Sequence, residues 1–290
     1  MLRFLLNPSS GRGAGAKHLD RLRILATRFG AGLAVSRTAA DLPEQARRAA
    51  EDGVTRLIVA GGDGTMHLAI QGLAGTDCAL GVVPLGSGND LAGTLEVPAG
   101  LDAAVERAVS GPIGRMDLIR IGPVWSASYA GVGFDSEVTR AANQVRHLRG
   151  PAIYPWAVIK TLATFRAPHL RVEHDQGVFD GKAMFAVASN LPRFGGGMRI
   201  APEARIDDGL LDLVIVREVG KIALLRVFPK VYSGQHIGHP DVEFVRTRSA
   251  SFAVDRPMFL YGGGELIRPM KPGEPVDLEV VPGALAIVGR

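Results

Sequence analysis

The sequence has a single cysteine, Cys78, and lacks long apolar runs. One cysteine excludes an intramolecular disulfide and a cysteine-cluster zinc site, which fits a reducing cytoplasm. The longest stretch without Asp, Glu, Lys or Arg, 121–134, is shorter than the ~20 residues that a membrane-spanning helix needs. The apolar opening, 1–6, reaches Asn7-Pro8 too soon for a signal-peptide core. We therefore expect any membrane contact to be peripheral.

Runs of like charge are also missing, and the overall charge is only weakly basic. Lys and Arg number 33 against 29 Asp and Glu, giving a net charge of +4. This balance suits anionic partners in general, but no Lys/Arg run resembles a nucleic-acid-binding arm. We expect no nucleic-acid partner. A length of 290 residues is enough for two domains of ordinary size.

The first 110 residues alternate short apolar runs with amphipathic segments. This alternation predicts strand–helix units and a mostly parallel sheet. We predict strands at 3–7, 33–36, 56–60 and 79–84, and helices at 17–29, 43–52, 66–73 and 101–110. The N-terminal domain is therefore predicted to be α/β.

After residue 114 the pattern changes to many short apolar segments separated by turn residues, which favours an antiparallel sheet or sandwich. We predict strands at 116–121, 126–130, 170–174, 184–189, 210–216, 251–254 and 278–281. A helical insertion, interrupted by Gly150-Pro151, is predicted within 136–166, and a further helix at 221–232. The second domain is therefore predicted to be mainly β.

Three loops rich in glycine or small polar residues follow predicted strands of the first domain: NPSSG at 7–11, GGDGT at 61–65 and LGSGND at 85–90. In a parallel sheet they would emerge at one carboxyl edge, where open α/β folds bind ligands. Glycine backbones and helix N-termini bind phosphate oxygens. Ser87 and Asn89 could hydrogen-bond a nucleotide, and Asp63 or Asp90 could hold Mg²⁺ between phosphates.

These motifs, in this order and spacing, resemble the diacylglycerol kinase catalytic-domain family and its bacterial lipid-kinase relatives. The likeness continues through GVGFD at 131–135, GGG at 195–197 and the segment 204–211, which ends in DGLL. It implies a Rossmann-like α/β domain at 1–115, akin to NAD kinase and diacylglycerol kinase, and an antiparallel β-sandwich domain at 116–290. Whether the last apolar stretch, 276–288, returns to the first domain is open.

The resemblance also implies site residues. The nucleotide site would include Asn7, Thr38, Gly61, Gly62, Asp63, Gly64, Thr65, Met66, His67, Ser87 and Asn89. Asp208 would ligate a structural Mg²⁺ together with the backbone carbonyls of Arg205 and Leu210, since Mg²⁺ prefers oxygen ligands. Without the resemblance, the turn at 207–209 would be read simply as a hairpin.

The family's catalytic base is the acidic residue of a DGE motif, and the matching stretch here is YGGGE at 261–265. Glu265 is therefore the candidate base and Asp63 a second candidate for catalysis. Glu265 would take the proton of a lipid hydroxyl that attacks the γ-phosphate of ATP. The sequence departs from the family pattern at Gly263, His67 and Leu68.

We therefore expect a cytoplasmic ATP- and Mg²⁺-dependent lipid kinase with transfer between its domains and peripheral contact with the inner face of the membrane. The helical segment 154–165, with Trp156 and Lys160, fits either that contact or a core helix. Two alternatives remain: a kinase for a soluble substrate, like NAD kinase, and a non-catalytic nucleotide- or lipid-binding regulator. The identity of the lipid and the oligomeric state, monomer or homodimer, are open.

Overall fold

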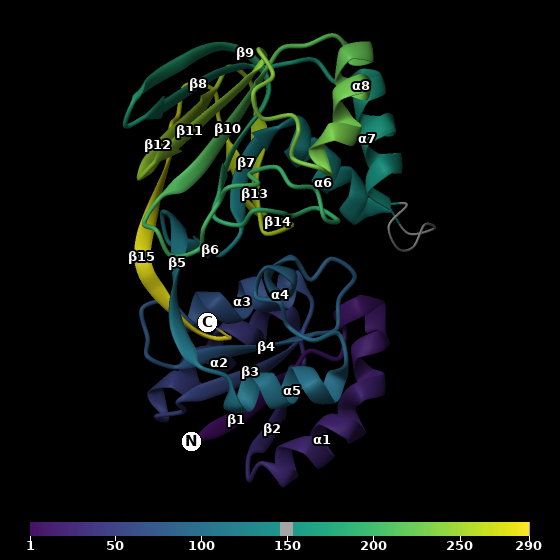
Figure 1. Cartoon of the computed structure of the whole chain (residues 1–290), viewed down its shortest axis with the longest axis vertical. Helices are drawn as coiled ribbons and strands as arrows, with labels where there is room; N and C mark the ends of the chain where they lie inside the picture. The colour runs from purple at the N-terminus through teal and green to yellow at the C-terminus, as the bar shows by residue number, and fades with distance from the viewer. Residues whose placement is uncertain (146–152, 290) are drawn as a thin grey trace. The chain divides into compact units, whose positions relative to one another are not determined.

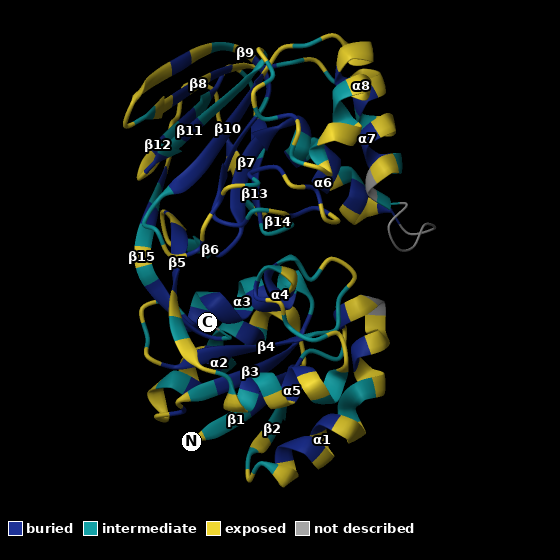
Figure 2. Cartoon of the chain, in the orientation of Figure 1, coloured by how far each residue is buried: buried dark blue, intermediate teal, exposed yellow. Residues whose placement is uncertain are grey.

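The computed structural model describes residues 1–145 and 153–289. It divides them into two compact units: unit 1 is 1–118 together with the C-terminal residues from 281, and unit 2 is 119–280. Each unit has its own buried core (Figure 2). The predicted interruption at Gly150-Pro151 lies outside the described residues.

Unit 1 is built on a parallel sheet in the order β15-β4-β3-β1-β2 (Figure 1), in which the C-terminal part of β15 (Val276–Val288) returns to pair with β4. Its strands are β1 (Leu2–Leu6), β2 (Gly32–Val35), β3 (Arg56–Gly61) and β4 (Ala79–Pro84). Its helices are α1 (Leu19–Arg28), α2 (Leu42–Glu51), α3 (Asp63–Leu73), α4 (Asp90–Thr94) and α5 (Leu101–Ser110), with 3-10 turns η1 (Ser10–His18) and η2 (Ala39–Asp41). The predicted α/β architecture is confirmed.

The core of unit 1 explains why these strands are nearly continuous in apolar residues. β3 and β4 are buried along almost their whole length, as expected for central parallel strands covered by helices. Leu22 of α1 and Val105 of α5 pack in one cluster with Phe4 and Ile58 of the sheet. Each of these helices therefore buries one apolar stripe against the strands.

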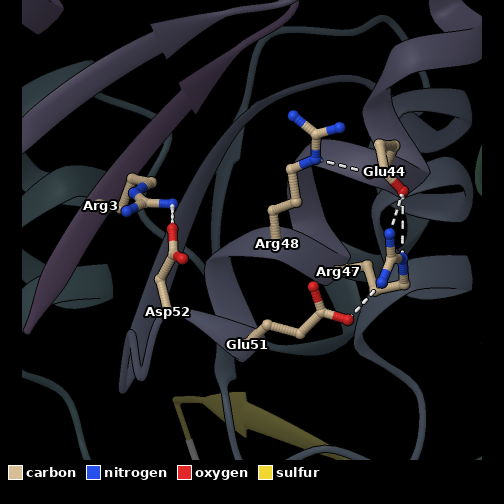
Figure 3. Close-up of polar contacts among 6 residues, drawn as sticks. All are labelled: Arg3, Glu44, Arg47, Arg48, Glu51 and Asp52. Atoms are coloured by element: carbon tan, nitrogen blue, oxygen red, sulfur yellow. Dashed lines mark hydrogen bonds and ion pairs between the residues drawn. The ribbon is translucent and has the colours of Figure 1, made fainter.

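The outer surface of α2 carries a set of exposed ion pairs, shown in Figure 3. Glu44 accepts hydrogen bonds from Arg47 and Arg48, and these contacts lower the pKa of the Glu44 carboxyl. Asp52, just beyond the helix, pairs with Arg3 of β1 at 2.9 Å. Because these groups are solvated, each pair stabilises the fold only weakly.

Unit 2 is an antiparallel sandwich whose two sheets share β9 (Gly177–Ser189). One sheet has the order β14-β13-β7-β9-β10-β11 and the other runs from β9 through β8 and β12 to β15. The remaining strands are β5 (Ile113–Ile121), β6 (Val124–Ser126), β7 (Tyr129–Gly133), β8 (His169–His174), β10 (Leu211–Arg217), β11 (Val242–Thr247), β12 (Ser249–Val254), β13 (Met258–Gly262), β14 (Glu265–Met270) and β15 (Val276–Val288). The predicted antiparallel sandwich is confirmed.

Three helices belong to unit 2: α6 (Phe134–Gln144), α7 (Ile153–Thr164) and α8 (Lys221–Val231). Their apolar residues form a second cluster against the sheet, which includes Phe134, Leu162, Leu224 and Val214. This cluster lies on the face of the β7–β9–β10 sheet opposite the sandwich interior, because neighbouring residues of each strand point to opposite faces.

Several predicted elements need correction. The segment 126–130 is not one strand: β6 ends at Ser126 and β7 begins at Tyr129, and the Ser126 hydroxyl closes the turn by donating to the Tyr129 carbonyl at 2.8 Å. The first predicted helix, 17–29, starts earlier, as the 3-10 turn η1, and is α-helical only from Leu19. The elements α4, β11, β13 and β14 were not predicted.

Candidate active site

Unit 1 brings the three predicted loops together at one edge of its sheet. β1, β3 and β4 are parallel neighbours, so the loops 7–11, 61–65 and 85–90 all start where a strand ends. The backbone N–H of Asn7 donates to the Ala60 carbonyl at 3.1 Å, and that of Leu85 to the Gly61 carbonyl at 2.8 Å. The loops are therefore held in register by the sheet itself.

Side-chain contacts join the first loop to the second. The Asn7 amide donates to the Thr65 hydroxyl at 2.9 Å, and Thr65 is buried. Gly11 lies so close to the third loop that a Cβ atom there would be 2.7 Å from the Leu85 carbonyl oxygen. Any larger residue at position 11 would have to move the backbone.

Asp63 joins the second loop to the third. Its carboxylate accepts the backbone N–H of Asn89 at 2.6 Å and that of Asp90 at 2.7 Å. Burial is the largest influence on this carboxyl and raises its pKa, so the hydrogen bonds do not fully offset desolvation. A carboxyl whose pKa is shifted by burial and by specific partners is typical of functional sites.

The same two loops touch through their glycine backbones. A Cβ atom on Gly86 would lie 2.7 Å from the Gly62 Cα atom, and one on Gly62 would lie 3.1 Å from the Gly86 Cα atom. α3 starts at Asp63, directly after this contact. Free N–H groups and the helix dipole make such an N-terminus attractive to phosphate. The junction of the three loops, called the loop junction below, can therefore bind an anion.

The remaining predicted nucleotide residues fall into two groups. Thr38 and Ser87 are exposed, Thr38 beyond the end of β2 on the same sheet edge and Ser87 within the third loop. Asn89 instead uses its side-chain amide inside its own loop, accepting from the Gly86 N–H at 2.9 Å and donating to the Gly86 carbonyl at 2.8 Å. Asn89 therefore shapes the loop in its left-handed conformation.

Two further predicted residues lie within the first turns of α3. Met66 is buried in the core. His67 is half-buried, and burial lowers the pKa of its imidazole, which favours the neutral ring. Neither is exposed at the surface of the junction in the way that Ser87 is.

The candidate base, Glu265, lies in unit 2 at the start of β14. Gly262 pairs with Glu265 across a two-residue hairpin whose residues Gly263 and Gly264 have φ of 60° and 84°. Two positive φ angles are typical of the tight turns that favour glycine and asparagine. The Asn143 amide of α6 donates to the Gly264 carbonyl at 2.9 Å and fixes this turn.

The Glu265 side chain is exposed, yet partial desolvation of its carboxyl raises its pKa. A raised pKa makes a carboxylate a stronger base, which suits proton abstraction. Gly263 occupies a left-handed position that an aspartate tolerates only moderately well. Gly263, which stands where the family's DGE motif has aspartate, therefore leaves the hairpin geometry intact.

Asp208, the predicted side-chain ligand of a metal ion, contacts protein groups in this structure. Asp208 accepts the Leu210 N–H at 3.1 Å through one oxygen, and its other oxygen pairs with the Arg246 guanidinium of β11. Arg246 Nε also lies 3.9 Å from Asp212, which is fully buried. Among the described residues no cluster of three metal-ligating side chains occurs here or elsewhere. As arranged, the Arg246 guanidinium already neutralises Asp208, so a divalent ion at this carboxylate would have to displace Arg246.

Replacing Arg246 with glutamine is expected to create a dependence of stability on divalent metal. The substitution leaves Asp208 and the buried Asp212 without their countercharge, so a bound cation would then stabilise the fold. In thermal unfolding, the native chain should respond little to chelator or to millimolar Mg²⁺, whereas the variant should be destabilised and then partly restored by Mg²⁺. Arg248→Gln, on the neighbouring exposed position, is the control. Equal Mg²⁺ responses in all three chains would contradict the competition between Arg246 and metal.

An apolar cavity of about 90 Å³ lies in unit 2 beneath α6, α7 and α8. Its wall is aliphatic and aromatic, with few polar side chains, among them Asp135, Thr139 and His236. His236 Nε2 is 2.9 Å from the Ile200 carbonyl oxygen. Within the described residues neither Asp135 carboxylate oxygen makes a hydrogen bond. The cavity therefore combines an apolar wall with a buried acid.

Burial raises the pKa of Asp135 to about 7. In the unfolded chain the Asp135 carboxyl ionises near its ordinary pKa of about 4. Between pH 4 and pH 7 it is therefore deprotonated in the unfolded state but still protonated in the folded state. Stability contributed by the protonated Asp135 should therefore fall as pH rises through this window. A pKa shift of about three units corresponds to a change of roughly 4 kcal/mol in the free energy of unfolding.

Asp135→Asn should remove this dependence and make the chain more stable than the native protein at pH 8. The measurement is the urea midpoint at pH 5 and pH 8. Asp212, whose pKa burial also raises to about 7, should leave a residual slope in the variant. The exposed Asp255→Asn is the control and should keep the full native slope. A native midpoint that rises from pH 5 to pH 8 would contradict the expectation.

The sequence analysis assigned no role to Arg246 or His236. Arg246 is 38 residues from Asp208, and the two meet only because β10 pairs with β11 in antiparallel register. The GVGFD motif did mark Asp135, but its burial against the cavity depends on helices far along the chain. Local sequence patterns therefore predict neither the Arg246–Asp208 ion pair nor the burial of Asp135 against the cavity.

Comparisons with known proteins agree with the two units. The model for the diacylglycerol kinase catalytic domain matches residues 1–121. The model for the YegS C-terminal NAD kinase beta sandwich-like domain matches residues 128–289. Together they span nearly the whole chain.

Relatives of known name extend over the same length. A diacylglycerol kinase of Mycobacterium tuberculosis is 32% identical over 98% of this chain and 93% of its own. One of Bacillus subtilis is 28% identical over 95% and 93%. A crystal structure of a diacylglycerol kinase from Bacillus anthracis matches with a TM-score of 0.77 at 19% identity, covering 100% of this chain and 96% of that one, which shows the shared fold. The chain therefore belongs to the diacylglycerol kinase family.

Proposed function

We propose that this protein transfers the γ-phosphate of ATP to the hydroxyl of diacylglycerol. The observation that carries the proposal is the loop junction, where Asn7 contacts Thr65 and Asp63 contacts Asn89 and Asp90 at the carboxyl edge of a parallel sheet. This edge is where α/β folds bind nucleotides. The names of the relatives supply the acceptor lipid.

In this proposal the loop junction, with Gly61, Gly62 and Gly64, binds the ATP phosphates, while exposed Thr38 and Ser87 contact the nucleotide. Phosphate-bound Mg²⁺ would neutralise developing charge, and Asp63 and Asp90 are its candidate protein ligands at the loop junction. Arg205, Asp208 and Leu210 remain candidates for a structural ion only if Arg246 moves away.

Glu265 is proposed to accept the proton of the lipid hydroxyl. As the oxygen bonds to the γ-phosphorus, the bond from that phosphorus to the β-phosphate oxygen breaks and ADP leaves. Unit 2 would bind the lipid, with an acyl chain in the cavity beneath α6, α7 and α8. We propose accordingly that unit 1, residues 1–118 with the C-terminal residues from 281, is the nucleotide domain, and that unit 2, residues 119–280, is the lipid domain.

The test is transfer of ³²P from the γ-position of ATP to diacylglycerol in mixed micelles with Mg²⁺. Label extracted with the lipid and migrating as phosphatidic acid would support the proposal. A sphingoid base and phosphatidylglycerol, run in parallel, would identify a different lipid acceptor. Formation of NADP from NAD would indicate a soluble-substrate kinase, and ATP binding without any product would indicate a regulator.

No helix among the described residues is long and apolar enough to cross a membrane.

A further inference from the structure

α6 is attached to the strands that lead to the candidate base. The buried Ser136 hydroxyl donates to the Gly131 carbonyl of β7 at 2.6 Å. One turn further along the helix, the Arg140 guanidinium lies 5.9 Å from the centre of the Phe259 ring of β13. Figure 1 shows the helix beside these strands. Because both contacts lie within unit 2, α6 and the sheet form one local framework.

The hairpin that precedes Glu265 is packed at its base but open at its tip. A Cβ atom on Gly262 would lie 2.6 Å from the Tyr129 carbonyl oxygen of β7. The tip consists of Gly263 and Gly264. Apart from its chain neighbours, no heavy atom of the described residues lies within 4 Å of the place that a Cβ atom on Gly264 would take. Since glycine loses more backbone freedom on ordering than other residues, this tip needs a contact from outside the hairpin to keep one conformation.

Asn143 of α6 makes such a contact. Its side-chain amide donates to the Gly264 carbonyl at 2.9 Å, one residue before Glu265. Asn143 is itself exposed and lies next to the last residue of the helix. A single hydrogen bond adds only about 1 kcal/mol to the stability of a fold. Its main consequence here is local, because it fixes the point at which the chain enters β14.

Other residues of the same helix line the apolar cavity. Phe134, Val138 and Thr139 belong to its wall. At 100° per residue, Val138 and Asn143 point in directions about 140° apart. α6 therefore contacts the cavity with one side and the glycine turn with another.

We propose that Asn143 is a positioning residue for Glu265. A general base has to lie within hydrogen-bond reach of its proton, and a displacement of ~1 Å can lower a rate about 10²-fold. By tying the turn to α6, Asn143 places the Glu265 carboxylate relative to the cavity wall on the same helix. The inference rests on the proposed function, in which Glu265 accepts the proton and the cavity holds an acyl chain.

The first test needs no catalysis. Amide hydrogen exchange of residues 262–266 is measured without ligand in the native chain, in Asn143→Ala and in Gln144→Ala. Asn143→Ala should exchange about tenfold faster in this segment, because the turn loses its hydrogen bond to α6. Gln144→Ala is the matched control, a similar truncation at the next exposed position, and should exchange at the native rate. Native exchange in Asn143→Ala, or equal acceleration in both variants, would overturn the inference.

The second test is kinetic and uses the micelle assay. Asn143→Ala should lower kcat by about 10–100-fold and leave the KM for ATP within about twofold of native, whereas Gln144→Ala should keep both values. A native kcat in Asn143→Ala, or a KM for ATP that changes as much as kcat, would show that Asn143 does not position the base. If no chain phosphorylates lipid while the exchange results hold, the proposed function fails and the tie between Asn143 and the turn stands.

Discussion

Glu265→Gln is expected to lower the rate of phosphate transfer to lipid by about 10²–10⁴-fold while leaving ATP affinity within about twofold of native. Glutamine keeps the size of the side chain but cannot accept the hydroxyl proton. The side chain is exposed at the edge of a hairpin fixed by Gly263, Gly264 and Asn143, so the substitution should leave the fold unchanged. The measurements are initial rates in the micelle assay and ATP binding by calorimetry.

The pH dependence gives an independent readout of the same group. A base works only when ionised, so activity should rise with pH through the pKa of Glu265. Desolvation raises that pKa, so the acidic limb should lie above the pH at which an ordinary glutamate titrates. Glu274→Gln, at an exposed glutamate in the turn before β15, is the control and should retain both rate and pH profile. A Glu265→Gln variant with native activity would remove this residue from the mechanism.

The second large effect is expected from Asp63→Ala, which should weaken ATP binding by at least about tenfold and lower activity further. Alanine removes the acceptor for both the Asn89 and the Asp90 N–H, so the third loop loses its tie to the second. Removing the buried carboxylate relieves its desolvation, whereas losing its two hydrogen bonds leaves two N–H groups without this acceptor, so these opposed effects should leave the melting temperature little changed. Loss of affinity without loss of stability is the expected signature of a positioning residue.

Asp52→Ala is the matched control for Asp63→Ala. It removes an aspartate of the same unit whose side chain is 55% exposed and whose only role visible in Figure 3 is the ion pair with Arg3. ATP binding should be within about twofold of native in this variant. Native ATP affinity in Asp63→Ala would show that the loop junction does not bind the nucleotide.

Much of the fold follows from local patterns. The strand at Ala79–Pro84 and the helix at Leu101–Ser110 have the predicted bounds, because a buried parallel strand is continuously apolar and an amphipathic helix shows its period directly. The sequence-based predictions fail where strand pairing, rather than the local sequence pattern, defines an element. β13 and β14 are short, and only their partners define them, while the turn at Ala127 and Ser128 divides an otherwise continuous apolar stretch.

For the candidate site, the sequence by itself determined the three loops and their order, because glycine spacing after a strand is a local property, and its resemblance to the diacylglycerol kinase family marked Glu265. Only the tertiary structure decided how those residues are used. Asp63 meets Asn89 and Asp90 because two parallel strands end side by side, and Asp208 meets Arg246 because β10 and β11 pair. Such contacts depend on strand register and packing between residues far apart in the chain, and no local pattern encodes them.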